Sequence, residues 1–138
     1  MSNDWNHDEL LLRQVNPHHW DGKRPNSQAF VPYPKDEDKV SVDDGTMVGP
    51  EAAWRHFTER LGFSSVGTWA VSHGEVMEAG DLSVSRSPVS CESDPTRNNP
   101  AHCHIDFSRV SSKGPKRKRA QTLAIRAAER GCLFAGVK

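Results

Sequence analysis

Residues 101–107 read AHCHIDF, and the strict alternation in this stretch decides the fold class. Successive side chains of an extended strand point to opposite faces of a sheet. The stretch therefore has one polar face and one apolar face: His102, His104 and Asp106 on the first, and Cys103, Ile105 and Phe107 on the second. Because antiparallel sheets commonly keep one face on the core and one face polar, the pattern predicts a strand of an antiparallel sheet.

The chain around this strand supplies the other elements of such a sheet. Short apolar or alternating runs predict further strands at 10–15, 40–42, 66–71 and 82–84. Helices are predicted over 50–61, over the short segment 73–79 and over 115–130, each followed by a glycine that suits the position after a last turn. We predict an α+β fold: a small, mostly antiparallel sheet packed on one side by two main helices, the first at 50–61 and the second at 115–130, with long Pro-rich loops.

The predicted domain organisation is simple. Residues 1–9 are polar and are expected to be disordered, and residues 10–138 are expected to form a single α+β domain that ends in the basic helix 115–130. Two long loops interrupt it, at 16–38 and 85–100, where Pro, Gly and Asn are frequent. A loop of about 20 residues is unusual in a compact domain and is often functional.

Composition excludes several classes of protein. No apolar run approaches the roughly 20 residues of a membrane span, and the N-terminus is acidic where a signal peptide would be basic and then apolar. Cys91, Cys103 and Cys132 are widely spaced and contain no CxxC pair, so neither a disulfide framework nor a thiolate zinc site is indicated. We therefore expect a cytoplasmic protein with no membrane partner and no cofactor. Its oligomeric state is left open.

The formal net charge of zero hides two opposed blocks. Residues 1–107 contain 9 Lys and Arg against 17 Asp and Glu, whereas residues 108–138 contain 9 against one. The basic block is concentrated at the start of the predicted helix 115–130, in five residues: Lys113, Lys116, Arg117, Lys118 and Arg119. Cations at a helix N-terminus oppose the helix dipole by about 0.3–1 kcal/mol each, so local helix energetics do not explain the cluster.

Two explanations of the basic cluster remain open. A bound polyanion would use the backbone amides and the cations together, which predicts nucleic acid or an acidic protein surface as the partner. Alternatively, the cluster lies near the acidic residues at 36–38 and 43–44 and the charges cancel within the fold. Trp20 and Tyr33 in the first long loop are candidate base-stacking residues if the partner is single-stranded.

The polar face of the strand at 101–107 is the candidate chemical site. His102 and His104 can transfer protons near neutral pH, Asp106 can tune them, and Arg13 on the first predicted strand can hold an anion. The alternatives are a solvated sheet face and a salt bridge between Arg13 and an acid such as Asp106. Metal binding by this row is left open, since two imidazoles and a carboxylate are metal ligands.

The strings LLRQV, SQAF, VSVDDG and NPAHCHIDF together resemble a frame found in small, uncharacterised prokaryotic proteins associated with conflict and phage-defence loci. The resemblance covers most of residues 10–107 and implies a role within a defence assembly. The HxHxD string is similar to that of metallo-β-lactamase-type hydrolases, but here Phe107 follows Asp106, no further His occurs after His104, and the chain is short for that fold. An Arg on the first strand followed by Ser-x-x-Phe faintly resembles ADP-ribosyltransferase-like folds, although no matching catalytic Glu context is present.

Two functional hypotheses follow. The first is a small binding module that engages nucleic acid or another phosphate-rich or acidic partner through the basic helix. The second is a nucleotide-directed transferase or hydrolase that uses Arg13, His102, His104 and Asp106. They differ geometrically, because the enzyme requires Arg13 and the row of His102, His104 and Asp106 to meet in one cleft, whereas the module requires only an exposed basic cluster.

Overall fold

The alternating stretch forms strand β5 (His102–Asp106), which pairs antiparallel with β2 (Lys39–Asp44) on one side and with β4 (Ser83–Arg86) on the other. Cys103 and Ile105 are fully buried, while the three polar residues are half-buried. The predicted separation into an apolar and a polar face is therefore confirmed.

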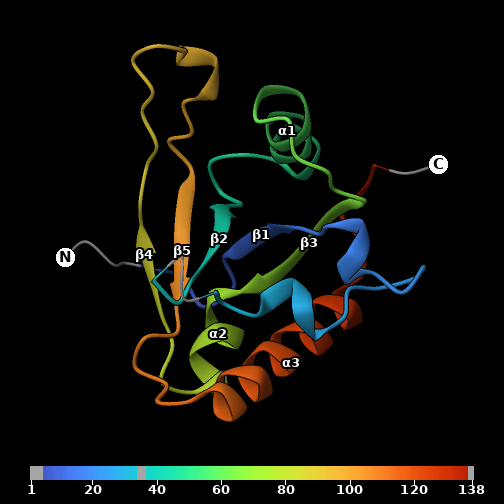
Figure 1. The fold of residues 1–138 in the computed structure, drawn as a ribbon, viewed down its shortest axis with the longest axis vertical. Coiled ribbons are helices and arrows are strands. Elements are labelled where there is room, and N and C mark those ends of the chain that lie inside the picture. The colour runs from blue at the N-terminus through green and yellow to red at the C-terminus, as the bar shows by residue number, and fades with distance from the viewer. Residues whose placement is uncertain (1–4, 34–36, 137–138) are drawn as a thin grey trace.

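The computed structural model describes residues 5–33 and 37–136, and within them β5 belongs to a six-stranded antiparallel sheet of order β4-β5-β2-β1-β3-β6 (Figure 1). Three helices accompany the sheet, so the predicted α+β class is confirmed. The remaining strands and the helices have the following bounds: β1 Leu10–Gln14, β3 Gly67–Ser72, β6 Phe134–Ala135, α1 Pro50–Arg55, α2 His73–Ala79 and α3 Lys113–Arg130. Of the helices that the structure describes, none combines the length and the apolar character needed to span a bilayer.

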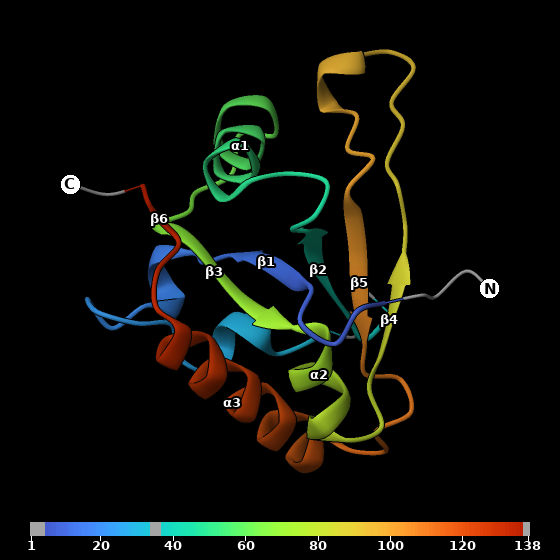
Figure 2. The same cartoon turned by 180° about the vertical axis from the view of Figure 1, so that it is seen from behind.

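The helices cover both faces of the sheet rather than one, which corrects the expectation that the two main helices share a side (Figures 1 and 2). Leu11 and Val71 pack in the larger core with Leu123 of α3, whereas their neighbours Leu12 and Ala70 pack in a second cluster with Ala53 of α1. Every residue of β3 is buried. The physical reason is that β1 and β3 are central strands whose consecutive side chains all need cover, so each face requires its own helix.

Helix α3 starts two residues earlier than predicted and ends where expected, before Gly131 at φ 95°. Its buried residues are the small ones of the predicted stripe together with one leucine: Ala120, Leu123, Ala124 and Ala127. Small side chains let the helix lie close to β3 and to the 3₁₀ turn η2 (Ser27–Phe30), where Ala29 and Phe30 are fully buried. The first long loop is thereby held against α3.

Helix α1 continues into a π-helical turn, η4 (His56–Arg60), so that the predicted helix over 50–61 has two parts. Leu61 N donates to His56 O at 3.0 Å, the five-residue spacing of a π turn. The second long loop forms an arm that extends beyond the sheet between β4 and β5, with a 3₁₀ turn η5 (Pro95–Arg97) near its tip (Figure 1). Arg97 donates to the carbonyl of Arg60 at 3.2 Å and ties this tip to η4.

The sequence predicts disorder over residues 1–9, but the described part of this segment packs on the domain. Residues 1–4 lie outside the described residues. From Trp5 onward the segment contacts the domain: the Trp5 ring stacks on His73 at 5.3 Å, and the guanidinium of Arg86 lies 4.1 Å from the centre of the Trp5 ring. The described part of the segment thus lies against the start of α2.

Candidate functional site

The polar row on β5 is fixed by its own neighbours. His102 Nδ1 lies 2.8 Å from the carbonyl oxygen of Ser87, and the rings of His102 and His104 meet edge to face at 4.7 Å. Asp106 accepts a hydrogen bond from the backbone N–H of Ser108 at 2.8 Å. Each side chain of the row is therefore held in place by a contact with a residue close to it.

The packing of the row shifts the pKa values of His104 and Asp106. The pKa of His104 is lowered, first by burial and then by the neighbouring His102 and Lys39, so the ring stays neutral at physiological pH. Burial alone would raise the pKa of Asp106, but hydrogen bonds from Ser108 together with the charges of Lys39 and His104 outweigh it, and the pKa is lowered. Over residues 5–33 and 37–136, no three His, Cys, Asp or Glu side chains are grouped so that they could hold a metal ion.

Arg13 binds backbone carbonyls on the other side of the sheet. Its Nε donates to Ala29 O at 2.7 Å and its Nη1 donates to Ser41 O at 2.8 Å. Strand β1 pairs with β2 through residues 11–12, so the guanidinium of Arg13 reaches β2 just past the end of this pairing. Arg13 lies on the same face of β1 as Leu11 and Val15, whereas Asp106 lies on the opposite face of the sheet. The salt bridge between Arg13 and Asp106, one of the alternatives from the sequence, is therefore not formed.

The catalytic set proposed from the sequence is therefore only partly brought together. Arg13 and His102 both border one pocket, but the guanidinium of Arg13 binds carbonyls on the opposite face of the sheet, and His104 and Asp106 do not line the pocket. The geometry that the enzyme hypothesis requires, with Arg13 and the whole row in one cleft, is not reproduced.

The basic cluster divides into two groups. Lys116 forms an ion pair with Asp38, with 3.2 Å between Nζ and Oδ1, and Arg119 donates to Gly80 O at 2.9 Å and approaches Asp81 at 3.4 Å. Internal charge cancellation thus accounts for these two residues. The others are exposed and form no ion pair within the described part of the chain: Lys113, Arg117 and Lys118.

A groove next to these free cations joins the first long loop to the start of α3. We call it the α3 groove; it has a volume of about 500 Å³ and is lined by Gln28, Val31, Pro32, Tyr33, Asp38, Lys113, Lys116 and Arg117. Tyr33 is 40% exposed within this groove. Aromatic, apolar and cationic side chains are therefore gathered over one concave surface.

The two candidate stacking residues have different positions. Tyr33 lines the α3 groove, whereas Trp20 packs against the core and its indole N–H is buried without a partner in the described chain. The sequence could suggest Tyr33 by its residue type alone. Its proximity to the cations depends on the packing of η2 against α3, which no local pattern reveals.

A second pocket lies on the α1 side of the sheet. We call it the His56 pocket; it has a volume of about 160 Å³ and its lining includes Arg13, Asp43, His56, Phe57, Asn99 and His102. Only Arg13 and His102 were candidate site residues from the sequence, because Asp43 entered it only among the acidic residues at 43–44 and His56 only as part of the predicted helix over 50–61. The π-helical turn that begins at His56 has no sequence signal of its own.

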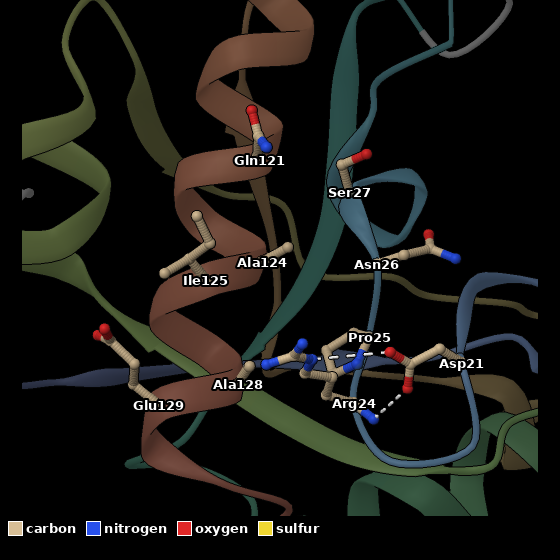
Figure 3. Close-up of a pocket in the computed structure, with 10 residues that line it drawn as sticks. All are labelled: Asp21, Arg24, Pro25, Asn26, Ser27, Gln121, Ala124, Ile125, Ala128 and Glu129. Atoms are coloured by element: carbon tan, nitrogen blue, oxygen red, sulfur yellow. Dashed lines mark hydrogen bonds and ion pairs between the residues drawn. The ribbon is translucent and has the colours of Figure 1, made fainter.

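A third groove, on the outer face of α3, is a weaker candidate (Figure 3). It has a volume of about 470 Å³ and lies between the 21–27 loop and α3. Arg24 turns toward Asp21 in this groove, with 3.6 Å between Nε and Oδ2, and Glu129 stands on the helix side. Because these charges compensate one another, the groove favours no particular ligand.

Comparisons of the chain with protein-family models, with curated proteins and with solved structures found no match. The functional assignment consequently rests on the geometry of the described residues.

Proposed function

We propose that the protein is a binding module that engages single-stranded nucleic acid through the α3 groove. The observation that carries the proposal is the position of Tyr33 beside Lys113, Lys116 and Arg117. Single-strand binders combine a cationic track for the phosphates with aromatic rings on which bases stack, and the α3 groove supplies both features.

The charge distribution supports a polyanionic partner. Ser112, the N-cap of α3, makes no side-chain cap hydrogen bond, so the first turn of an 18-residue helix keeps backbone N–H groups available beside three exposed cations. Cations at this end cost stability in the free protein, and a phosphate group would relieve that repulsion while accepting hydrogen bonds from the backbone.

The wider setting belongs to the same proposal. The protein acts in the cytoplasm as part of a prokaryotic defence assembly, and the support for this is the resemblance of the sequence to proteins from such loci. An acidic protein surface is the alternative partner for the cations. It would not need Tyr33, so a Tyr33 variant distinguishes the two kinds of partner. The transferase or hydrolase hypothesis has less support, because Arg13 and the β5 row face opposite sides of the sheet.

The direct experiment is a salt titration with an oligothymidine of about 12 nucleotides, within the site sizes of single-strand binders. If Lys113, Arg117 and Lys118 each neutralise one phosphate, the logarithm of the affinity falls with the logarithm of the salt concentration with a slope of about −2. Affinity should then drop about 15- to 20-fold between 50 and 200 mM salt.

A pair of variants localises the effect. The double variant Lys113→Gln, Arg117→Gln should leave one phosphate contact and reduce the slope to about −0.7. The control Lys23→Gln, Arg60→Gln removes the same charge from exposed residues outside the α3 groove and should keep the parental slope. Equal slopes for the two double variants, or no binding by the parent protein, would refute the proposal.

A further inference from the structure

The His56 pocket contains polar atoms that the fold does not use. His56 Nε2 is buried and has no hydrogen-bond partner among the described residues. His102 Nδ1 faces the carbonyl of Ser87, which can only accept, so Nδ1 carries the proton and Nε2 is an acceptor when the ring is neutral. A buried polar atom without a partner costs free energy, and a ligand that pairs with it recovers that cost.

The carboxyl group of Asp43 belongs to the same pocket as these imidazoles. Asp43 is the register partner of His102 on the neighbouring strand, and both His102 and His56 interact electrostatically with it. One carboxylate oxygen accepts from Asn99 Nδ2 at 2.8 Å. Burial raises the pKa of Asp43, because the charged form is poorly solvated there.

The remaining wall of the pocket is apolar and aromatic. Leu12, Phe57, Leu61 and Phe63 line it, and the rings of Phe57 and Phe63 lie 5.2 Å apart. The volume of about 160 Å³ is smaller than the ~300–1,000 Å³ of pockets for drug-sized ligands. The pocket is therefore sized for a single small ring system.

The chemistry of the walls selects the class of ligand. No three His, Cys, Asp or Glu side chains of the described residues are grouped to hold a metal ion, and the buried carboxyl group of Asp43 disfavours an anion. A neutral planar ring with hydrogen-bond donors and acceptors on its edge can pair with the polar side chains and pack on the aromatic wall. Proteins recognise an unstacked base in this way, by hydrogen bonds to its edge and by stacking on aromatic or apolar side chains. The π-helical turn supports a functional role, because such turns occur frequently at functional sites.

We propose that the His56 pocket binds the base of a nucleoside, with Asp43, His56 and His102 contacting the edge of the base and Phe57 and Phe63 contacting the ring. This site is separate from the α3 groove. The two lie on opposite faces of the sheet, since Leu12 packs with the α1 cluster whereas α3 covers the face of Leu11. It therefore does not depend on the function proposed above.

The test uses the whole protein and four probes: adenosine, guanosine, cytidine and uridine. Titration followed by backbone amide NMR should show one or more nucleosides shifting the signals of Leu12, Phe57 and His102 in a saturable manner. His56→Ala and Asp43→Asn should each weaken this binding about tenfold, the usual effect of one lost hydrogen bond to a buried group.

Two controls keep the outcome interpretable. Asp106→Asn alters the same strand outside the pocket, and Lys113→Gln, Arg117→Gln alters only the α3 groove, so both should bind the nucleoside as the parent does. Urea unfolding of each variant shows whether it is folded, and His56→Gln provides a milder replacement if His56→Ala is not. Failure of all four nucleosides to shift the pocket signals would overturn the proposal, as would parental affinity in folded variants of both His56 and Asp43.

Discussion

Replacing Tyr33 by alanine removes the only aromatic ring that lines the α3 groove within the described chain. The ring is 40% exposed and lies beside Lys113 and Arg117, so a base stacked on it would lie close to the cations that hold the phosphates. Stacking of one base on an aromatic ring contributes about 1–3 kcal/mol. The substitution should therefore weaken binding of an oligothymidine about 5- to 150-fold at fixed salt.

The assay is fluorescence anisotropy of the labelled oligonucleotide at two salt concentrations. Tyr33→Ala should leave the salt slope unchanged, because no charge is removed, whereas Tyr33→Phe should bind nearly as the parent does, because it keeps the ring. Phe63→Ala is the matched control, since Phe63 is 54% exposed and lies in the other pocket. Parental affinity in a folded Tyr33→Ala protein would refute the stacking argument and would favour an acidic protein as the partner.

Three further predictions concern the fold. Arg13→Ala should lower the free energy of unfolding in urea by about 2–3 kcal/mol, because the carbonyls of Ala29 and Ser41 lose charge-assisted hydrogen bonds. Arg13→Lys should recover only part of this loss, and an unchanged free energy would argue for a purely functional arginine. Leu123→Ala should cost about 2–5 kcal/mol by the same measurement, since the side chain is fully buried, and a cost below about 1 kcal/mol would contradict the described core. Burial alone would raise the pKa of Asp44, but hydrogen bonds from Arg86 and Thr46 outweigh burial and lower that pKa. The ionised Asp44 therefore stabilises the fold fully above the pKa of an unfolded Asp, about 4, and this stabilisation is lost as the pH falls through the lower pKa of the folded state. Thermal unfolding of Arg86→Gln should show a weaker fall over that acid range, and an identical pH profile would disprove the pairing.

Much of the fold was predictable because its signals are local. The alternation at 102–107, the apolar run around Trp69 and the helix that ends before Gly131 all appear at the expected positions. The placement of the two main helices on one side was wrong, although a signal existed. GTWAVS in β3 has no polar alternation, which is typical of a strand buried on both faces.

The candidate site was less predictable, because both pockets are made of segments far apart in the sequence. The sequence identified the basic cluster but could not tell which cations the fold already pairs: Lys116 and Arg119 meet Asp38 and Asp81, and the others stay exposed. It also could not place Tyr33, since that depends on how η2 packs on α3.

Binding of single-stranded nucleic acid by the α3 groove is tested most directly by mapping backbone amide signals during titration with oligothymidine. Saturable shifts are expected at Tyr33, at Lys113 and Arg117, and along the first turn of α3, with little change at Phe63 on the opposite face. Saturable shifts confined to other surfaces, or no shifts at all at low salt, would contradict it.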